Sequence, residues 1–173
     1  MDLLATVSEV IDTRSFSAVW YWIAVATIWS SATHWILGIP WDMVVRARAD
    51  PAAAEDLQDL ARVNVNRVLR VVGASGTAAT ALVAAALTLM GVTGFVYGSE
   101  FAQALFLIAA PMTLASLLAA RRARIIARDS ASGDALVAHL VGLRRQVQGI
   151  ALVAIFVSAL YGMLWNLAVG PFW

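Results

Sequence analysis

Residues 71–95 read VVGASGTAATALVAAALTLMGVTGF and contain no charged side chain. A helix of about 20 mostly apolar residues crosses the ~30 Å hydrocarbon core of a bilayer, so this stretch predicts a membrane span. Three further runs without Asp, Glu or Arg cover residues 15–41, 101–120 and 146–173. We therefore expect an all-α integral membrane four-helix bundle, with spans near 17–40, 71–95, 101–120 and 148–169.

The composition supports the same class of protein. Of 173 residues, 61% are hydrophobic and 13% charged, whereas soluble domains carry about 25% charged residues. There is no cysteine, which excludes disulfides and thiolate ligands, and a net charge of +1 gives no reason to expect a nucleic-acid partner. We expect one membrane domain, residues 1–173, and a short surface helix within residues 1–15, where Asp2, Glu9 and Asp12 argue against a cleaved signal peptide.

The connections between the spans differ in length. Asp50-Pro51 is a helix-start signal, and the spacing of Leu57 and Ala61 predicts an amphipathic helix that runs into the second span. Residues 96–100 form a short turn containing Gly98, which makes spans two and three antiparallel neighbours. The segment 121–147 breaks at residues 129–133, after which a helix from Asp134 leads into the last span.

The arginines predict the orientation. All twelve basic residues are arginine, and eleven lie in the 42–70 and 121–145 connections. The positive-inside rule places those connections in the cytoplasm and both termini in the periplasm.

Tryptophan and arginine also indicate membrane anchors, because both residue types favour the bilayer interface. Trp20 and Trp41 are 21 residues apart, or about 31 Å along a continuous helix, which matches the hydrocarbon core. The expected membrane-anchoring residues are Trp22, Trp41, Arg121, Arg122, Arg144, Arg145 and Trp165.

The first span carries the polar residues from which a site is predicted. Small and polar side chains favour helix–helix contacts in membranes, so we expect the face of this span that carries them to point into the bundle. Trp22, Trp29 and Ile36 would then face lipid or a partner. The expected packing or interface residues are Trp20, Thr27, Ser30, Ser31, His34 and Gly38, with Gly73 and Gly76 from the second span.

His34 is the one ionisable residue deep within a predicted span, and such residues are candidates for function. It has a structural interpretation, as a neutral imidazole bonded across helices. It also has a ligand interpretation, because Ser30, four residues earlier, leaves room for a macrocycle as in bacteriochlorophyll-binding helices; haem is the related alternative. Quinone or proton handling is a third interpretation.

A catalytic hypothesis rests on Gly73-Ala74-Ser75-Gly76, which matches the G-x-S-G string of intramembrane rhomboid proteases. Ser75 would be the nucleophile and His34 its base. Close packing of small residues explains the same string, and we expect no catalytic residue or metal site.

The segments Ile11-Asp12-x-Arg14-Ser15-Phe16-Ser17, Trp20-Tyr21-Trp22 and Thr33-His34-Trp35-x-Leu37-Gly38-x-Pro40-x-Asp42 resemble a family of small alphaproteobacterial multi-span membrane proteins. Its members are often labelled "component of SufBCD complex". The resemblance is clearest over roughly the first 70 residues, and it implies a link to iron–sulfur assembly without implying any catalytic residue. A chain without cysteine cannot itself hold a cluster through thiolates.

These observations favour a non-catalytic accessory or scaffold subunit of a bacterial inner-membrane complex, respiratory or photosynthetic, whose partners are the lipid bilayer and other membrane subunits. The spans contain little polar machinery, and a chain with small extramembrane segments acts most simply by packing against other subunits. The alternatives are a bacteriochlorophyll- or haem-binding protein with His34 as axial ligand, and a hydrolase that uses Ser75 and His34. The sequence does not identify a cofactor.

Overall fold

The computed structural model describes residue 16 and residues 19–169, and this part of the chain is almost entirely helical. Its elements, in chain order, are α2 (Val19–His34), β1 (Trp35–Ile36), β2 (Ile39–Pro40), α3 (Trp41–Arg46), α4 (Pro51–Gly91), the π-helix η1 (Val92–Val96), α5 (Glu100–Arg128) and α6 (Gly133–Val169). Three helical stretches are long and apolar enough to cross a membrane: Gly76–Val96, Glu100–Arg128 and Gly133–Trp165. The all-α, multi-span prediction is confirmed at this level. The predicted surface helix at residues 1–15 lies outside the described residues.

The first predicted span, residues 17–40, is wrong as a continuous helix. The helix ends at His34 after 16 residues, about 24 Å at 1.5 Å per residue. Residues 35–40 form a two-stranded hairpin in which Ile36 pairs with Ile39. Leu37 (φ 54°) and Gly38 (φ 74°) are its turn, and two positive φ values in succession are the mark of a type I′ hairpin turn.

The hairpin has two consequences for the sequence predictions. Trp41 begins α3, so it does not lie on the same continuous helix as Trp20, and the argument from their 31 Å spacing fails. The hairpin also joins α2 to α4, because the Asn64 side-chain amide donates to the Gly38 carbonyl at 3.1 Å.

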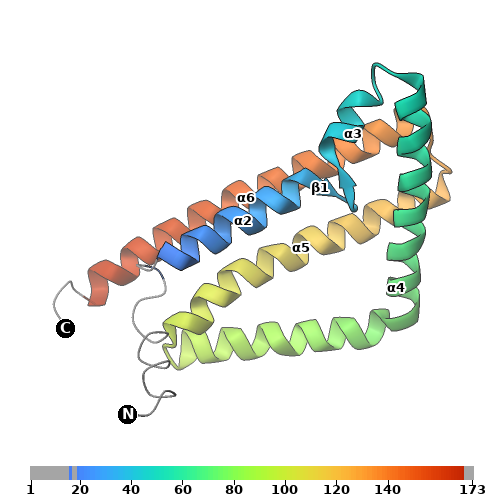
Figure 1. Cartoon of the computed structure of the whole chain (residues 1–173). Helices are drawn as coiled ribbons and strands as arrows, with labels where there is room; N and C mark the ends of the chain where they lie inside the picture. Colours follow the sequence, from blue (N-terminus) through green and yellow to red (C-terminus); the bar gives the residue numbers. More distant parts are fainter. Residues whose placement is uncertain (1–15, 17–18, 170–173) are drawn as a thin grey trace, which may run out of the picture.

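Helix α4 confirms the predicted amphipathic helix and its run into the second span. The Asp50 carboxylate caps it by accepting the Ala52 N–H at 3.0 Å, with Pro51 at the first position. Leu57, Ala61 and Val65 are its buried face. Figure 1 shows the helix turning sharply about midway, and the membrane-length stretch begins at Gly76. Sharp helix kinks occur at Gly/Ser pairs, and residues 73–76 have the sequence Gly-Ala-Ser-Gly.

The connection from α4 to α5 is a tight turn, as predicted. Ser99 caps α5 by accepting the Ala102 N–H at 3.4 Å, and Gly98 takes a φ of 74°. In η1, a Cβ on Gly94 would lie 2.9 Å from the Gln103 backbone nitrogen, so only glycine fits there. The buried Gln103 side chain donates to the Gly94 carbonyl at 2.8 Å, which joins the two helix ends.

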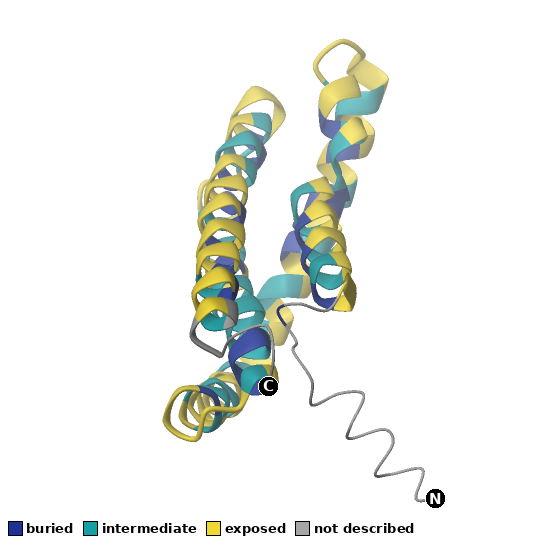
Figure 2. Cartoon of the chain, turned by 90° about the vertical axis from the view of Figure 1, so that its left-hand side faces the viewer, coloured by how far each residue is buried: buried dark blue, intermediate teal, exposed yellow. Residues whose placement is uncertain are grey.

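Part of the buried core lies where the first half of α4 meets the end of α5 and the start of α6. It combines Leu57 and Ala61 with Ile126, Leu136 and Leu140. Figure 1 shows α3, the first half of α4, the end of α5 and the start of α6 gathered at one end of the molecule, with the long apolar helices extending from it. Figure 2 shows exposed residues along the outer sides of the helices. The membrane-length stretch of α4 is almost entirely exposed or half-buried, whereas α5 and α6 each have buried residues along them.

A candidate interaction face on helix α2

Helix α2 packs against α6 through a large apolar face. Tyr21, Val25 and Trp29 follow one another at four-residue spacing and are all buried. Trp22 is partly buried and its indole donates to the Phe16 carbonyl at 3.1 Å. The prediction that Trp22, Trp29 and Ile36 face outward is therefore wrong: large apolar side chains fill the space beside α6, and the small polar ones are left outside.

The opposite face of α2 is exposed and polar. It contains Trp20, Thr27, Ser30, Ser31 and His34, all of which were expected to point into the bundle. Trp20 is 44% exposed and keeps one ring contact across the bundle, with Phe101 of α5 at 6.2 Å between centroids. We call Thr27, Ser30, Ser31 and His34 the α2 polar face.

Hydrogen bonding separates this face from the other apolar helices. Thr80, Thr88 and Thr113 each donate to the carbonyl four residues earlier, at 2.6–2.8 Å, which satisfies the hydroxyl inside its own helix. Ser116 does the same. Within the described chain, the side chains of Thr27, Ser30 and Ser31 make no hydrogen bond. The same holds for Thr77 beside the bend of α4 and for Ser130 and Ser132 in the connection between α5 and α6.

His34 lies in the last turn of α2 and is exposed. Its ring meets the edge of the Trp35 indole, with centroids 5.6 Å apart and planes at 72°. The imidazole has no hydrogen-bond partner among residue 16 and residues 19–169, so both ring nitrogens are available to a group outside the chain. Those described residues contain no cluster of three or more His, Asp or Glu side chains suited to a metal.

Of the three glycines predicted to pack closely, Gly38, Gly73 and Gly76, only Gly38 has a close neighbour from another element. Gly38 is exposed, and a Cβ there would approach the Asn64 amide to 3.2 Å. Gly73 faces open space, and a Cβ on Gly76 would meet only Val72 of its own helix. Gly73 and Gly76 therefore allow the bend of α4 and do not pack against a neighbouring helix of this chain. The side chain of Ser75 lies outside the described part, so its pairing with His34 stays a hypothesis.

No known protein family, characterised protein or solved structure matches this chain. The function must be argued from its own surfaces.

Besides Trp22, four of the expected anchors have specific contacts within the chain. The Trp41 ring lies under the Arg144 guanidinium at 3.9 Å, a cation–π contact that holds α3 on α6. The Trp165 indole donates to Glu100 at 3.2 Å. Arg122 bridges α5 and α6 by donating to Gln146 at 3.1 Å, while Arg121 and Arg145 are exposed. Anchoring of these residues to a membrane stays a prediction.

Glu100 is a structural centre that the sequence analysis missed. One carboxylate oxygen accepts the Phe16 N–H at 2.7 Å and the other accepts the Trp165 indole N–H. It therefore ties the chain before α2 and the end of α6 to the first turn of α5, where the helix dipole favours a negative charge. An isolated acid in a turn between two apolar runs was the available signal.

Proposed function

We propose that this chain is a non-catalytic accessory or scaffold subunit of a larger bacterial inner-membrane complex, respiratory or photosynthetic, and that the α2 polar face is its contact with the partner subunit. The observation that carries the proposal is the set of three exposed hydroxyls, on Thr27, Ser30 and Ser31, that make no hydrogen bond in the described chain. Hydrocarbon offers such groups no partner, whereas a neighbouring membrane helix does.

The placement of α2 supports a fourth membrane crossing. Figure 1 shows α2 running beside α6, whose Gly133–Trp165 stretch is of membrane length, and the two helices are in contact. Four crossings with the arginine-rich end in the cytoplasm put both termini in the periplasm. The α2 polar face then lies on the outside of a four-helix bundle, within the bilayer.

The expected energy of this contact is modest but measurable. Interhelical hydrogen bonds in membranes contribute roughly 0.6 kcal/mol each. Loss of two such bonds therefore weakens binding of the partner by about 1.2 kcal/mol, which is roughly sevenfold in affinity.

The test is purification of the tagged full-length chain from its native membrane in mild detergent, with identification of the proteins that accompany it. We expect a stoichiometric partner with the unaltered chain and a large loss of it with Thr27→Leu/Ser31→Leu. The matched control is Thr80→Leu/Thr88→Leu, which changes two exposed hydroxyls that are satisfied within α4 and should keep the partner. A chain that elutes alone from its native membrane contradicts the proposal.

A second candidate is a cofactor-binding protein with His34 as an axial ligand to bacteriochlorophyll or haem. The unpartnered, exposed imidazole favours it, because a ligating histidine needs a free ring nitrogen. This function requires a visible absorption band in the native preparation that His34→Ala removes and Thr27→Leu/Ser31→Leu retains. A colourless native complex excludes it.

A further inference from the structure

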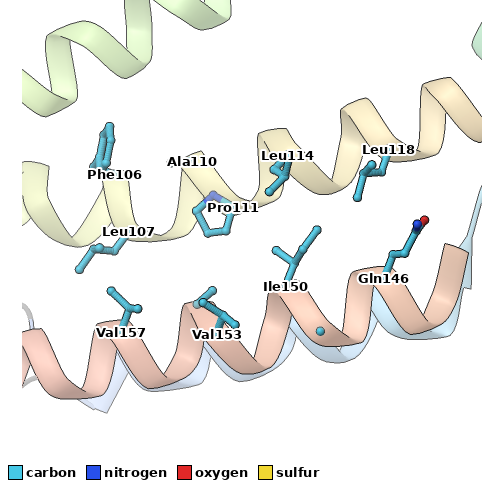
Figure 3. Close-up of a pocket in the computed structure, with 12 residues that line it drawn as sticks. Phe106, Leu107, Ala110, Pro111, Leu114, Leu118, Gln146, Ile150, Val153 and Val157 are labelled. Carbon is cyan, nitrogen blue, oxygen red and sulfur yellow. The ribbon is translucent and has the colours of Figure 1, made fainter.

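An apolar groove runs between α5 and α6 on a side of the molecule that α2 does not cover. We call it the α5–α6 groove; Figure 3 shows Leu107, Pro111 and Leu114 of α5 facing Ile150, Val153 and Val157 of α6. Its volume is about 590 Å³, within the range of roughly 300–1,000 Å³ typical of ligand sites. Leu114, Val153 and Val157 are exposed, so the groove opens to the outside of the bundle.

Two residue choices create this space. Gly149 lines the groove, and a Cβ placed on it would have no neighbour within 4 Å. Pro111 also lines it, and its ring replaces a backbone N–H, which leaves the carbonyl four residues earlier without its helical donor. From Phe106 to Leu118 the groove is about 18 Å long, close to the ~15 Å thickness of one hydrocarbon leaflet.

One end of the groove is basic. A second cavity of about 270 Å³ is lined by Arg121, Arg122 and Ile125, and it shares Leu118 and Gln146 with the groove. Arg122 is held across the gap by Gln146 at 3.1 Å and by the His139 ring at 3.4 Å. Gly142 faces this guanidinium, and a Cβ there would make an ordinary van der Waals contact, 3.7 Å from the Arg122 Nη2.

These arginines have no counter-charge within the described chain. The ion pairs among residue 16 and residues 19–169 are Arg46–Asp42 and Arg62–Asp59, both exposed, so neither Arg121 nor Arg122 meets a carboxylate. A partly buried guanidinium without a carboxylate partner attracts an anion, and guanidinium binds phosphate oxygens with two parallel N–H donors.

We propose that the α5–α6 groove binds an anionic phospholipid, with one acyl chain lying along Leu107, Pro111 and Val153 and its phosphate bound by Arg121 and Arg122. The apolar length fits a single leaflet, and the basic cavity lies where that leaflet's headgroups lie when the helices cross the bilayer. Basic pockets between membrane helices are typical sites for anionic headgroups. The groove is separate from the α2 polar face, so lipid binding there does not depend on whether the α2 polar face binds a partner subunit.

The experiment measures the thermal unfolding midpoint of the full chain in a neutral detergent with added dioleoylphosphatidylglycerol. At a lipid concentration about 100 times Kd, we expect a rise in Tm of roughly 5–10 °C. Arg122→Gln should lose most of this rise because it removes the charge, and Gly149→Leu should lose it because its side chain fills the groove without a clash. Arg124→Gln and Ala159→Leu are the matched controls: both positions are exposed on the same helices, neither lines the groove, and both should keep the rise.

Three results would overturn the proposal. An equal rise with dioleoylphosphatidylcholine would show that the arginines do not select an anion, and an equal rise with glycerophosphate would assign the cavity to free phosphate. A protein crosslinked from Val153→Cys in native membranes would assign the groove to a partner helix; this label is specific because the chain has no other cysteine. If Arg122→Gln does not fold, Arg121→Gln and Gly149→Leu decide the outcome.

Discussion

Gly38 adopts a φ of 74°, where residues with a Cβ are strained, and its carbonyl accepts the Asn64 amide. We predict that Gly38→Ala destabilises the chain by about 1–2 kcal/mol, because alanine is unfavourable at positive φ and its Cβ would lie 3.2 Å from the Asn64 nitrogen. Thermal unfolding followed by circular dichroism in detergent measures this loss. Gly149→Ala, within a helix and without a close neighbour, should be neutral or slightly stabilising. An equal loss of stability in both variants would argue against strain in the hairpin turn as the cause.

Glu100 is the residue whose replacement should loosen the end of the bundle opposite the arginines. Glu100→Leu removes the acceptors of the Phe16 N–H and the Trp165 indole, and we expect a loss of roughly 1–3 kcal/mol. Glu100→Gln keeps one acceptor oxygen and should lose about half as much. The readouts are the unfolding midpoint and the intrinsic fluorescence of the chain, to which Trp165 contributes as one of seven tryptophans. Glu55→Leu, which removes an exposed acid on α4, is the control and should leave both unchanged.

At the scale of elements, the sequence predicts where the helices lie along the chain better than it predicts which face of each helix is buried. Charge-free runs locate the apolar stretches of α4, α5 and α6, and Asp50-Pro51 marks the start of α4. The same criterion extended the first helix to residue 40, because the hairpin at residues 35–40 is also free of charge. Gly38 and Pro40 were the contrary signals: glycine permits the turn, and a residue before proline avoids the α conformation.

The faces of α2 were inverted for a physical reason. The interior of a membrane bundle was expected to select small polar residues, but the neighbour of α2 in this chain is α6, whose buried residues include the small Ala151, Ala154, Ser158 and Gly162. A helix with small buried residues leaves room for large side chains on its neighbour, and Tyr21, Val25 and Trp29 are the buried residues of α2. Such complementarity depends on which helices are neighbours, and periodicity within α2 alone does not contain that information.

The bend of α4 is an element-scale feature with its own prediction. Gly73→Ala/Gly76→Ala raises helix propensity by roughly 1 kcal/mol at each position and should favour a straighter α4. Spin labels at Glu55→Cys and Thr88→Cys, both exposed, report the change by double electron–electron resonance. A straight helix separates them by about 50 Å, whereas the bent chain should give a clearly shorter distance that lengthens in the double-alanine variant. A distance near 50 Å in the unaltered glycine background would contradict the bend.

For the whole molecule, the fold gives the arginine asymmetry a spatial meaning. Eleven of twelve arginines lie in residues 42–70 and 121–145. The structure brings these segments together at one end, with the apolar helices extending from it (Figure 1). Because the chain has no cysteine, single cysteines report the side of the membrane directly. Tyr97→Cys marks the turn between η1 and α5, and Ser132→Cys marks the connection between α5 and α6; both sites are exposed.

We predict that a membrane-impermeant maleimide labels Tyr97→Cys in intact spheroplasts and labels Ser132→Cys only after the membrane is permeabilised. The reason is that arginine is retained on the cytoplasmic side during insertion, so the end with Arg121 and Arg122 stays inside. Asp42→Cys, at an exposed position of α3 at the arginine-rich end, tests the α2 crossing separately. It should behave like Ser132→Cys if the arginine-rich end is cytoplasmic as a whole. The reverse labelling pattern would place both termini in the cytoplasm, and different labelling of Asp42→Cys and Ser132→Cys would refute a shared arginine-rich end.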